Sequence, residues 1–527
     1  METTHEDNGT GRDDGLVETE NGALAFASHP SPFADFFFKV SSMRGWDADA
    51  KREAFSKCFA ADPALALRLL FFVRDIRGGL GERGLFRDVF AGLPDGVAAA
   101  LIPLVPEFGR WDDVWAVLGD GIADAAARPA LREAAFALLR HRWEEDLRAL
   151  ADPDGRPSLL AKWLPSVRGV SAKQESLAKE LAFSCFRLRP ADYRRKLSAL
   201  RARLRVTERS MCAGEWGSVD YGAVPSKAAL RYRNAFFAHD PERYKAYLAG
   251  LEKGTSKVNA GALYPYEIVA AYHGPVLAYP EDFEENPILE AQWKALPVPN
   301  GILGNAIVVR DGSGSMTTPV SGGRATALDV ATSLAVLASE HLEGPFANRF
   351  ISFSEHPRLV DLSGCATLRE KLVRTYGEDE CANTDVEETM RLVLDAVSEN
   401  GIPQEKVPAV VIISDMEFDE ARGCCFADDE EEDEDGEASK AGREILFETI
   451  RREWKDRGYD LPKMVFWNVA SRTGGVPLQE NGNGLVLASG FSQNILDMLS
   501  GVDPEDTIRR KLAAPRYDRV AAALRAA

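Results

Sequence analysis

The chain has 527 residues, more than one hydrophobic core usually serves, so two or three domains are expected. Its hydrophobic fraction of 45% and charged fraction of 28% are ordinary for globular domains. No apolar run approaches the roughly 20 residues needed to span a bilayer, so a membrane-spanning protein is excluded. The net charge of −19 argues against a nucleic-acid partner, provided that the charge is spread evenly.

The N-terminal residues 1–22 are acidic and lack the apolar core of a secretory signal. We expect them to form a disordered acidic tail. Seven cysteines are scattered along the chain, and no pair has the spacing of metal ligands. This usage fits a reducing compartment and indicates a cytoplasmic protein without a disulfide framework.

Charge is distributed unevenly along the chain. Between Ala151 and Lys257 there are 21 Lys and Arg against 11 Asp and Glu. Nine of the ten residues from Asp428 to Glu437 are acidic, a self-repelling composition typical of disordered loops. A polyanion would therefore bind to the basic stretch, in spite of the negative total.

Residues 23–299 are expected to form an all-α domain. Short amphipathic segments separated by Gly, Pro and Asp follow one another from Phe33 to about Leu251, without a convincing strand. Many short helices joined by short loops indicate a stacked helical repeat, although no clean period is present. The proline-rich stretch Pro287–Pro299 is expected to be a connector. The predicted helices cover residues 50–59, 64–76, 82–93, 97–105, 111–118, 130–151, 173–187, 193–211 and 227–238.

Residues 300–527 are expected to form an α/β domain, because the apolar pattern changes there. Strands alternating with helices indicate a parallel, doubly wound sheet. Ligands of such sheets bind at the carboxyl ends of the strands. The predicted strands are 306–309, 349–353, 409–413, 464–469 and 485–488, and the predicted helices are 324–342, 385–397 and 441–454.

Polar residues follow three of these elements at the same edge of the predicted sheet. Asp311, Ser313 and Ser315 come directly after the first strand, and the glycines between them permit a tight backbone path. Thr384 precedes a predicted helix, and Asp415 follows the strand at 409–413. Hydroxyls with few carboxylates suit a hard cation such as Mg²⁺ or Mn²⁺. The sequence therefore predicts a site for one divalent cation.

We expect Ser313 and Ser315 to coordinate the ion directly, and Thr384 to do so directly or through one water. Asp311 and Asp415 would act mainly through water. The incomplete shell leaves a position for water or for a partner's carboxylate. A P-loop requires Gly-x-x-x-x-Gly-Lys-Ser/Thr, and no lysine follows Gly314. An ordinary Gly/Ser turn would explain the first motif alone but not its conjunction with the other two positions.

This five-residue set resembles the metal-ion-dependent adhesion site of the von Willebrand factor A family, and all five positions match. The resemblance implies a von Willebrand A-like domain, Rossmann-like in topology, that presents a bound ion to a partner. Two features depart from the family. Arg310 occupies a strand position that is usually apolar, and the acidic run at 428–437 is an unusual insertion.

Several other stretches carry a second resemblance. Arg74–Arg83 and Ile102–Val114 are similar to the TROVE module of Ro-type ribonucleoproteins, which is a ring of HEAT-like helices joined to a von Willebrand A domain. This similarity implies binding of small non-coding or misfolded RNA. Four further stretches look closer to an uncharacterised relative with the same architecture, namely Val224–Lys227, Leu263–Ile268, Ser414–Asp419 and Gly490–Ser492.

Two functions remain open. In the first, a non-enzymatic protein holds RNA on a basic helical surface, while the metal site engages a protein partner. In the second, the protein is a metal-dependent interaction scaffold without RNA. No nucleophile–base pair or second metal cluster is evident, so we do not expect an enzyme. Each candidate RNA-binding side chain is also compatible with a solvated helix face, and the candidates are Arg77, Arg83, Arg110, Lys162, Arg168, Lys173, Arg194, Arg195, Arg201, Arg231 and Arg233.

Overall fold

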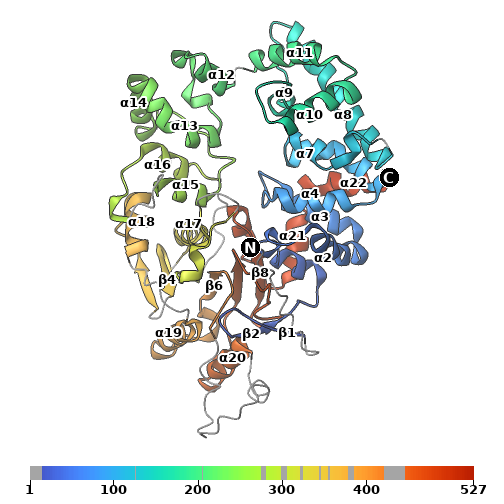
Figure 1. Cartoon of the computed structure of the whole chain (residues 1–527). Helices are drawn as coiled ribbons and strands as arrows, with labels where there is room; N and C mark the ends of the chain where they lie inside the picture. The colour runs from blue at the N-terminus through green and yellow to red at the C-terminus, as the bar shows by residue number, and fades with distance from the viewer. Residues whose placement is uncertain are drawn as a thin grey trace, which may run out of the picture. The chain divides into compact units, whose positions relative to one another are not determined.

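The chain folds into two compact units, each assembled from more than one stretch of sequence (Figure 1). The computed structural model describes residues 15–124, 126–204, 206–273, 280–297, 305–320, 325–343, 346–353, 357–377, 385–419 and 445–526. One unit, here called the α/β unit, comprises Met1–Gly45, Tyr264–Asn286 and Pro297–Lys511. The other, the helical unit, comprises Trp46–Leu263, Pro287–Leu296 and Leu512–Ala527. Within the described ranges, no helix is both long and apolar enough to cross a membrane.

A six-stranded sheet with the order β5-β4-β3-β6-β7-β8 is the centre of the α/β unit. All neighbouring pairs are parallel except β4 and β5, which are antiparallel at one edge. Within the sheet, the path starts at the central strand β3 and runs outward through β4 to β5. It then returns to β6, on the other side of β3, and runs outward through β7 to β8, which is the doubly wound order. This topology confirms the predicted α/β fold. The strands are β3 (Ala306–Asp311), β4 (Arg349–Phe353), β5 (Arg358–Asp361), β6 (Ala409–Ser414), β7 (Met464–Asn468) and β8 (Leu485–Ser489).

Helices cover both faces of this sheet, as expected for strands that are apolar on both sides. Alternate strand residues such as Ile307 and Ile412 join a core with α19 (Val386–Glu399) and α20 (Leu446–Asp456). The residues between them point to the opposite face, where α17 (Ala327–Ser339) packs on β3, β4 and β6. The remaining helices of the unit are α1 (Pro32–Phe38), α15 (Pro265–Tyr272), α18 (Leu368–Gly377) and α21 (Pro504–Leu512).

The N-terminal segment, residues 15–45, is an integral part of the α/β unit. Strands β1 (Leu16–Glu18) and β2 (Leu24–Phe26) form a hairpin, and α1 packs on β8. All four phenylalanines of α1 are at most 2% exposed. The prediction of a disordered tail is therefore wrong for residues 16–22, because distant hydrogen-bond partners hold a stretch whose composition alone resembles a loop. Residues 1–14 lie outside the described residues.

The described part of the helical unit contains helices and no strand, as predicted. Successive helices pack against one another, for example α2 on α3 and α4, and α13 on α14. Helix α10 continues as a π-helix over Leu181–Cys185. The helices are α2 (Ala48–Ala61), α3 (Pro63–Arg74), α4 (Arg83–Gly92), α5 (Asp95–Leu101), α6 (Val105–Phe108), α7 (Trp111–Ala116), α8 (Pro129–Ala151), α9 (Leu160–Trp163), α10 (Ala172–Glu180), α11 (Pro190–Arg203), α12 (Thr207–Cys212), α13 (Ser226–His239), α14 (Pro241–Glu252), α16 (Pro287–Lys294) and α22 (Asp518–Ala526).

The stretch expected to be a connector, Pro287–Pro299, instead begins with helix α16. Proline is favoured in the first turn of a helix, where its missing N–H has no intrahelical partner to lose. Ile288 and Trp293 are at most 5% exposed, and α16 packs on α13 and α14. Pro287 therefore marks the start of a helix with a buried face, and Pro287–Lys294 are not an extended connector.

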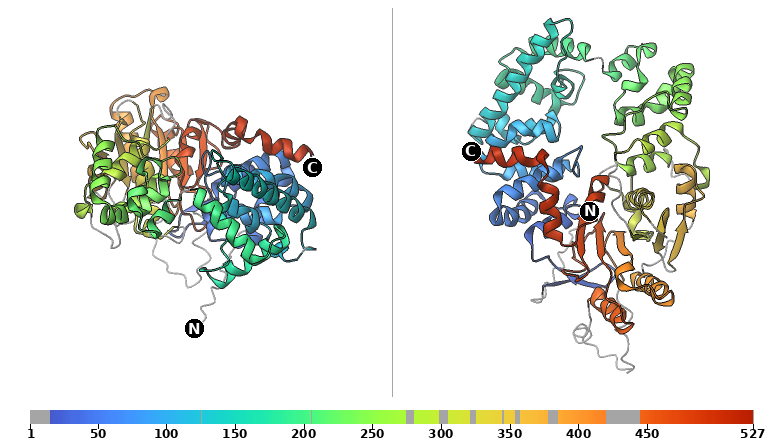
Figure 2. Two further views of the ribbon diagram at one scale, coloured as in Figure 1. Left: turned by 90° about the horizontal axis from the view of Figure 1, so that it is seen from above. Right: turned by 180° about the vertical axis from the view of Figure 1, so that it is seen from behind.

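The predicted boundary at residues 299 and 300 marks the change from helices to alternating strands and helices, but the compact units cross it. Helix α22 returns to the helical unit and packs on α3 and α5 (Figure 2). Just before it, Arg516 Nη2 donates to Asp75 Oδ1 at 2.8 Å, and the ring of Tyr517 stacks on Phe108. The C-terminal residues thus complete the core of the helical unit.

The two stretches that resemble the TROVE module meet in a buried ion-pair cluster. Arg74 donates to Asp113 Oδ2 from Nε at 3.0 Å and from Nη2 at 2.7 Å, and both side chains are at most 1% exposed. Arg87 donates to the other carboxylate oxygen at 2.7 Å. A Cβ atom at Gly109 would lie 2.4 Å from Asp113 Oδ2 and 2.9 Å from Arg74 Nε, so a side chain there would displace this ion pair. The ion pairs of Asp113 therefore connect α7 to α3 and α4.

Candidate metal centre and nucleic-acid interface

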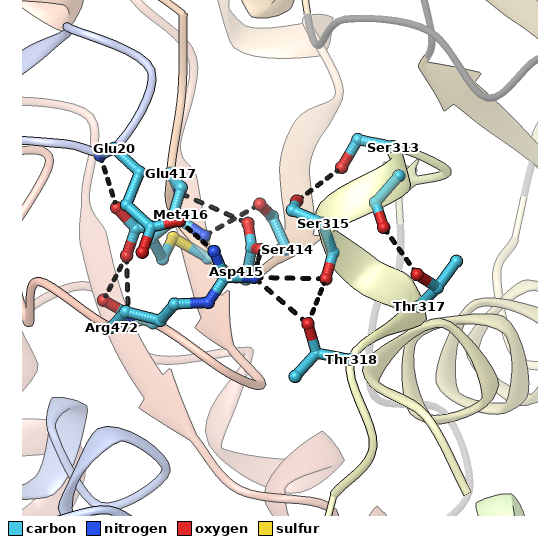
Figure 3. A network of polar contacts seen from close by, with 12 residues as sticks. Glu20, Ser313, Ser315, Thr317, Thr318, Ser414, Asp415, Met416, Glu417 and Arg472 are labelled. Carbon is cyan, nitrogen blue, oxygen red and sulfur yellow. Dashed lines mark hydrogen bonds and ion pairs between the residues drawn. The ribbon is translucent and has the colours of Figure 1, made fainter. Parts of the chain in front are cut away.

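The candidate metal site lies at the carboxyl ends of β3 and β6, which are neighbours in the sheet. Asp311 ends β3, Asp415 directly follows β6, and each is 1% exposed. The Ser313 N–H donates to Asp311 Oδ1 at 2.9 Å, and the hydroxyl oxygens of Ser313 and Ser315 are 3.0 Å apart (Figure 3). The structure thus brings four of the five predicted residues together. Thr384 lies outside the described residues, two positions before α19 begins.

Two buried carboxylates share this site. Burial raises the pKa of Asp311, although hydrogen bonds from Ser414 and Ser313 oppose the shift. Burial also raises the pKa of Asp415 to about 7, and the neighbouring charge of Asp311 adds to this effect. A bound cation would oppose both shifts, because its positive charge would favour the ionised carboxylates.

The donor set fits a hard divalent cation. Asp415 Oδ2 is buried and accepts no hydrogen bond from the described residues, so it retains an unused acceptor. Hydroxyl oxygens and a carboxylate are the ligand types that Mg²⁺ prefers, and Mg²⁺ commonly keeps several waters. Ser313 and Ser315 would hold the ion directly, and the two aspartates would hold its waters. Among the described residues, no three His, Cys, Asp or Glu side chains lie together as metal ligands would. The hydroxyl-rich set is therefore the candidate metal site in the described part of the chain.

Ser414 was not predicted as a site residue, yet it supports the site directly. Its hydroxyl donates to Asp311 Oδ2 at 2.6 Å and accepts from the Met416 N–H at 2.9 Å. Met416 has a φ of +65°, which is uncommon for a residue other than glycine and marks a tight turn after Asp415. The available sequence clue was a polar residue at the end of an otherwise apolar strand.

Arg310, the noted departure from the von Willebrand A pattern, is fully buried on the face that α17 covers. Its Nε and Nη2 lie 3.1 and 2.8 Å from Thr332 Oγ1, and its Nη1 lies 3.5 Å from Ser352 Oγ. The guanidinium also sits 5.7 Å from the ring centroid of Tyr376. Polar residues on α17, β4 and α18 therefore accommodate a charge where the family usually has an apolar side chain.

A positive charge of the protein also lies beside the candidate metal site. Arg472 follows β7, and its Nη2 is 3.2 Å from both Ser315 O and Thr318 Oγ1. The same nitrogen is 3.8 Å from Asp415 Oδ2. Its Nη1 pairs with Glu20, in the turn between β1 and β2 (Figure 3). Neither residue carried a local sequence pattern that would have singled it out.

A basic cavity of about 310 Å³ in the helical unit contains three of the predicted RNA-binding residues, Arg168, Arg194 and Arg201. Arg209, which was not predicted, is the fourth arginine. Ser166, Val167, Leu197, Ser198 and Val206 complete the lining, which includes no carboxylate among the described residues. This volume is at the lower end of the range of ligand pockets.

The four arginines of this cavity are not equivalent. Arg201 donates to Ala161 O at 2.8 Å and to Ser166 Oγ at 2.7 Å, and burial lowers its pKa. It therefore ties α11 to α9 and to the loop that follows α9. The side chains of Arg168, Arg194 and Arg209 are exposed and make no hydrogen bond or ion pair with any described residue. No described residue neutralises these three guanidinium groups, so within the described part of the chain they are available to bind an anion.

The remaining predicted RNA-binding residues do not line the cavity. Arg195 pairs with Asp192 at 3.0 Å, and Arg110 lies over the ring of Trp163 at 4.6 Å. Arg231 lies over the ring of Tyr232, and the half-buried Arg233 donates to Leu230 O. The others are distributed over other parts of the helical unit, with Arg77 after α3, Arg83 at the start of α4, Lys162 in α9 and Lys173 in α10.

Two families match different parts of the chain. The one described as Domain of unknown function (DUF7788) matches residues 305–513, which include the whole six-stranded sheet and the described metal-site residues. The one described as Domain of unknown function (DUF2828) matches residues 19–96 and 135–298, which include the basic cavity. The family boundary near residue 300 coincides with the predicted change of fold.

One relative in sequence is Uncharacterized protein L728 of Acanthamoeba polyphaga mimivirus. It is 27% identical over 520 residues, which are 93% of this chain and 85% of that protein. Among solved structures, the Ro (RSR) protein of Deinococcus radiodurans matches with 15% identity and a TM-score of 0.39, covering 88% of this chain and 92% of that chain. The chain is thus similar in sequence, over most of its length, to an uncharacterised viral protein.

Proposed function

We propose that this protein is a non-enzymatic RNA-binding protein of the cytoplasm, and that its α/β unit binds one Mg²⁺ or Mn²⁺ ion for contact with a protein partner. The observation that carries the RNA proposal is the cavity in which three arginines pair with no described residue and no described carboxylate is present. In a chain with a net charge of −19, most exposed arginines would be expected to find acidic neighbours. Arginines without acidic neighbours can form charge-assisted hydrogen bonds with phosphate groups, which supports the proposal.

RNA is favoured over a free phosphate compound because the cavity belongs to a wider basic region. The stretch from Ala151 to Lys257 carries ten more basic than acidic residues and includes every residue that lines the cavity. A polyanion can contact several such groups at once and gain affinity by releasing counterions. The resemblance to the TROVE module supports the same proposal.

The proposal can be tested with paired charge deletions on the full chain. We expect Arg194→Ala with Arg209→Ala to weaken binding of a single-stranded oligouridylate. The log–log salt slope should fall by about 1.4, because each lost phosphate contact removes roughly 0.7. Filter binding between low and moderate salt measures both quantities. Arg201 is unsuitable for this purpose because its replacement would also disturb the fold.

The matched control is Arg189→Ala with Arg195→Ala, which removes the same charge beside or within α11. Both of these arginines pair with Asp192, so their loss should change the slope much less. Equal losses in the two double variants would show non-specific attraction and contradict the cavity assignment. No RNA binding by the wild type at low salt would favour the metal-dependent scaffold.

A further inference from the structure

The position of Arg472 beside the candidate metal site needs a physical explanation. A guanidinium 3.8 Å from a carboxylate of the site would repel an incoming cation. It would, however, attract the same anionic group that a bound cation attracts. Arginine is well suited to binding such an anionic group, because its planar guanidinium can hold two oxygens of one carboxylate.

The backbone around Arg472 is held firmly, independently of its side chain. The carboxylate of Glu417, 2% exposed, accepts from the N–H of Arg472 at 2.7 Å and from the N–H of Thr473 at 3.1 Å. It also accepts from Ser471 Oγ at 3.2 Å. Glu417 is two residues from Asp415, so this loop is anchored to the strand end that carries the metal site.

The turn that carries Glu20 is anchored to the same strand end, again without the Glu20 side chain. Thr19 Oγ1 donates to Phe418 O at 2.7 Å, and Asn21 Nδ2 donates to Glu417 O at 2.7 Å. The Glu20 N–H donates to Glu417 Oε2 at 3.0 Å. The Glu20 carboxylate, 44% exposed, is left to pair with Arg472. Its contribution to folding is therefore small, since exposed ion pairs contribute little.

We propose that the metal site recognises a carboxylate of an acidic protein segment through two groups, the bound cation and Arg472, and that Glu20 is an internal carboxylate which this segment displaces. This inference rests on the proposed cation site. Arg472 contacts Ser315 O and Thr318 Oγ1 with one nitrogen, and Glu20 occupies another. Glu20 demonstrates that a carboxylate fits this face of Arg472, which is why an acidic protein segment is favoured over a nucleic-acid phosphate.

The test uses the full chain with a fluorescently labelled octaglutamate peptide in the presence of Mg²⁺. Glu20→Gln should bind the peptide more tightly by about threefold to tenfold, because an internal competitor is lost while the turn stays anchored. Arg472→Ala should weaken peptide binding by about tenfold or more, since one of two anion-binding groups is removed. Arg472→Lys should recover part of the loss, which a purely structural role would not allow.

Metal affinity is measured separately by isothermal titration, and in Arg472→Ala it should not fall together with the peptide affinity. Arg472→Ala should bind Mg²⁺ as tightly as the wild type or more tightly, because a repelling charge is removed. Matched controls are Glu399→Gln on α19 and Arg451→Ala on α20, both distant in sequence from the strand ends of the site. Neither control should alter peptide or metal binding.

The possible failures are distinguishable. A wild type that binds neither Mg²⁺ nor Mn²⁺ would overturn the cation site itself, and with it this inference. Normal metal binding with unchanged peptide affinity in Glu20→Gln and Arg472→Ala would overturn only the roles of these two residues. Oligouridylate binding that requires both Mg²⁺ and Arg472, with no peptide binding, would identify a phosphate partner and overturn the carboxylate assignment.

Discussion

At Asp113, two arginine side chains and a backbone amide converge on one buried carboxylate. The variant Asp113→Ala would leave Arg74, 1% exposed, without its counter-charge. Removing one partner of a buried ion pair typically costs about 3–5 kcal/mol. We expect the free energy of unfolding of the helical unit to fall by this amount in urea denaturation of the full chain.

The neighbouring Asp112 provides the control for this prediction. Its side chain is 23% exposed and pairs with Arg87 at 2.9 Å and with Arg110 at 3.6 Å. Partly exposed pairs contribute roughly 1 kcal/mol or less, so Asp112→Ala should be mild. Equal destabilisation by the two alanine variants would contradict a special role for the buried pair.

At the candidate metal site, the informative change is Asp311→Asn, which keeps the shape of the side chain and removes its negative charge. The variant should lose Mg²⁺ and Mn²⁺ binding, because the second negative charge of the site disappears. Its thermal unfolding without metal should stay close to that of the wild type, since burial already disfavours the charged form of Asp311. Isothermal titration and circular dichroism measure the two effects.

The surface variant Asp395→Asn is a suitable control, because Asp395 lies on α19 and pairs with Arg457. It should retain metal binding. Unchanged metal affinity in Asp311→Asn would refute the site, whereas loss of folding would show that this carboxylate has a structural role.

Among the elements, α1 and the β1–β2 hairpin decide whether the α/β unit can exist alone. A fragment that starts at residue 264 keeps the other two stretches of the unit but lacks the four phenylalanines of α1, each at most 2% exposed in the full chain. Burying one such side chain contributes about 1.5–3 kcal/mol, so their joint loss approaches the total stability of a typical domain. We expect this fragment not to unfold cooperatively in thermal denaturation.

Linking residues 15–45 to residues 264–511 should restore cooperative unfolding, because all three stretches of the unit are then present and α1 would again pack on β8. A stable fragment without residues 15–45 would show that the N-terminal segment is only an accessory layer.

Within α11, three arginines that look alike in the sequence have different environments. Arg194 is unpaired in the cavity, Arg195 pairs with Asp192, and Arg201 is anchored to carbonyl and hydroxyl oxygens. The local excess of positive charge could be predicted from composition. Which guanidinium groups make no ion pair with a described residue could not. Which arginine remains available depends on the acceptors that neighbouring segments bring to it.

For the whole molecule, the separation of charge predicts an electrostatic effect of the acidic run at 428–437, which lies outside the described residues. Replacing it with ten Gly and Ser residues removes nine negative charges. We expect tighter RNA binding at low salt and little change at high salt, where screening is strong. The melting temperature should shift by less than about 2 °C, since the run has no apolar side chain to bury.

Filter binding at several salt concentrations and calorimetry of the same two proteins measure these effects. A much larger fall in melting temperature would show that the run contributes to folding. Unchanged RNA affinity at low salt would show that it lies too far from the bound RNA to repel it.

The sequence by itself determined the α/β fold, the helical nature of the first half and four of the residues now seen together at the ends of two neighbouring strands. These features depend on periodicity and on short motifs at strand ends, which are local properties of a chain. Only the tertiary structure decided that Glu20 meets Arg472, 452 residues away, and that α22 completes the helical unit. It also decided which arginines share a cavity. Such contacts follow from long-range packing and leave no pattern in any short stretch of sequence, so they could not be predicted from it.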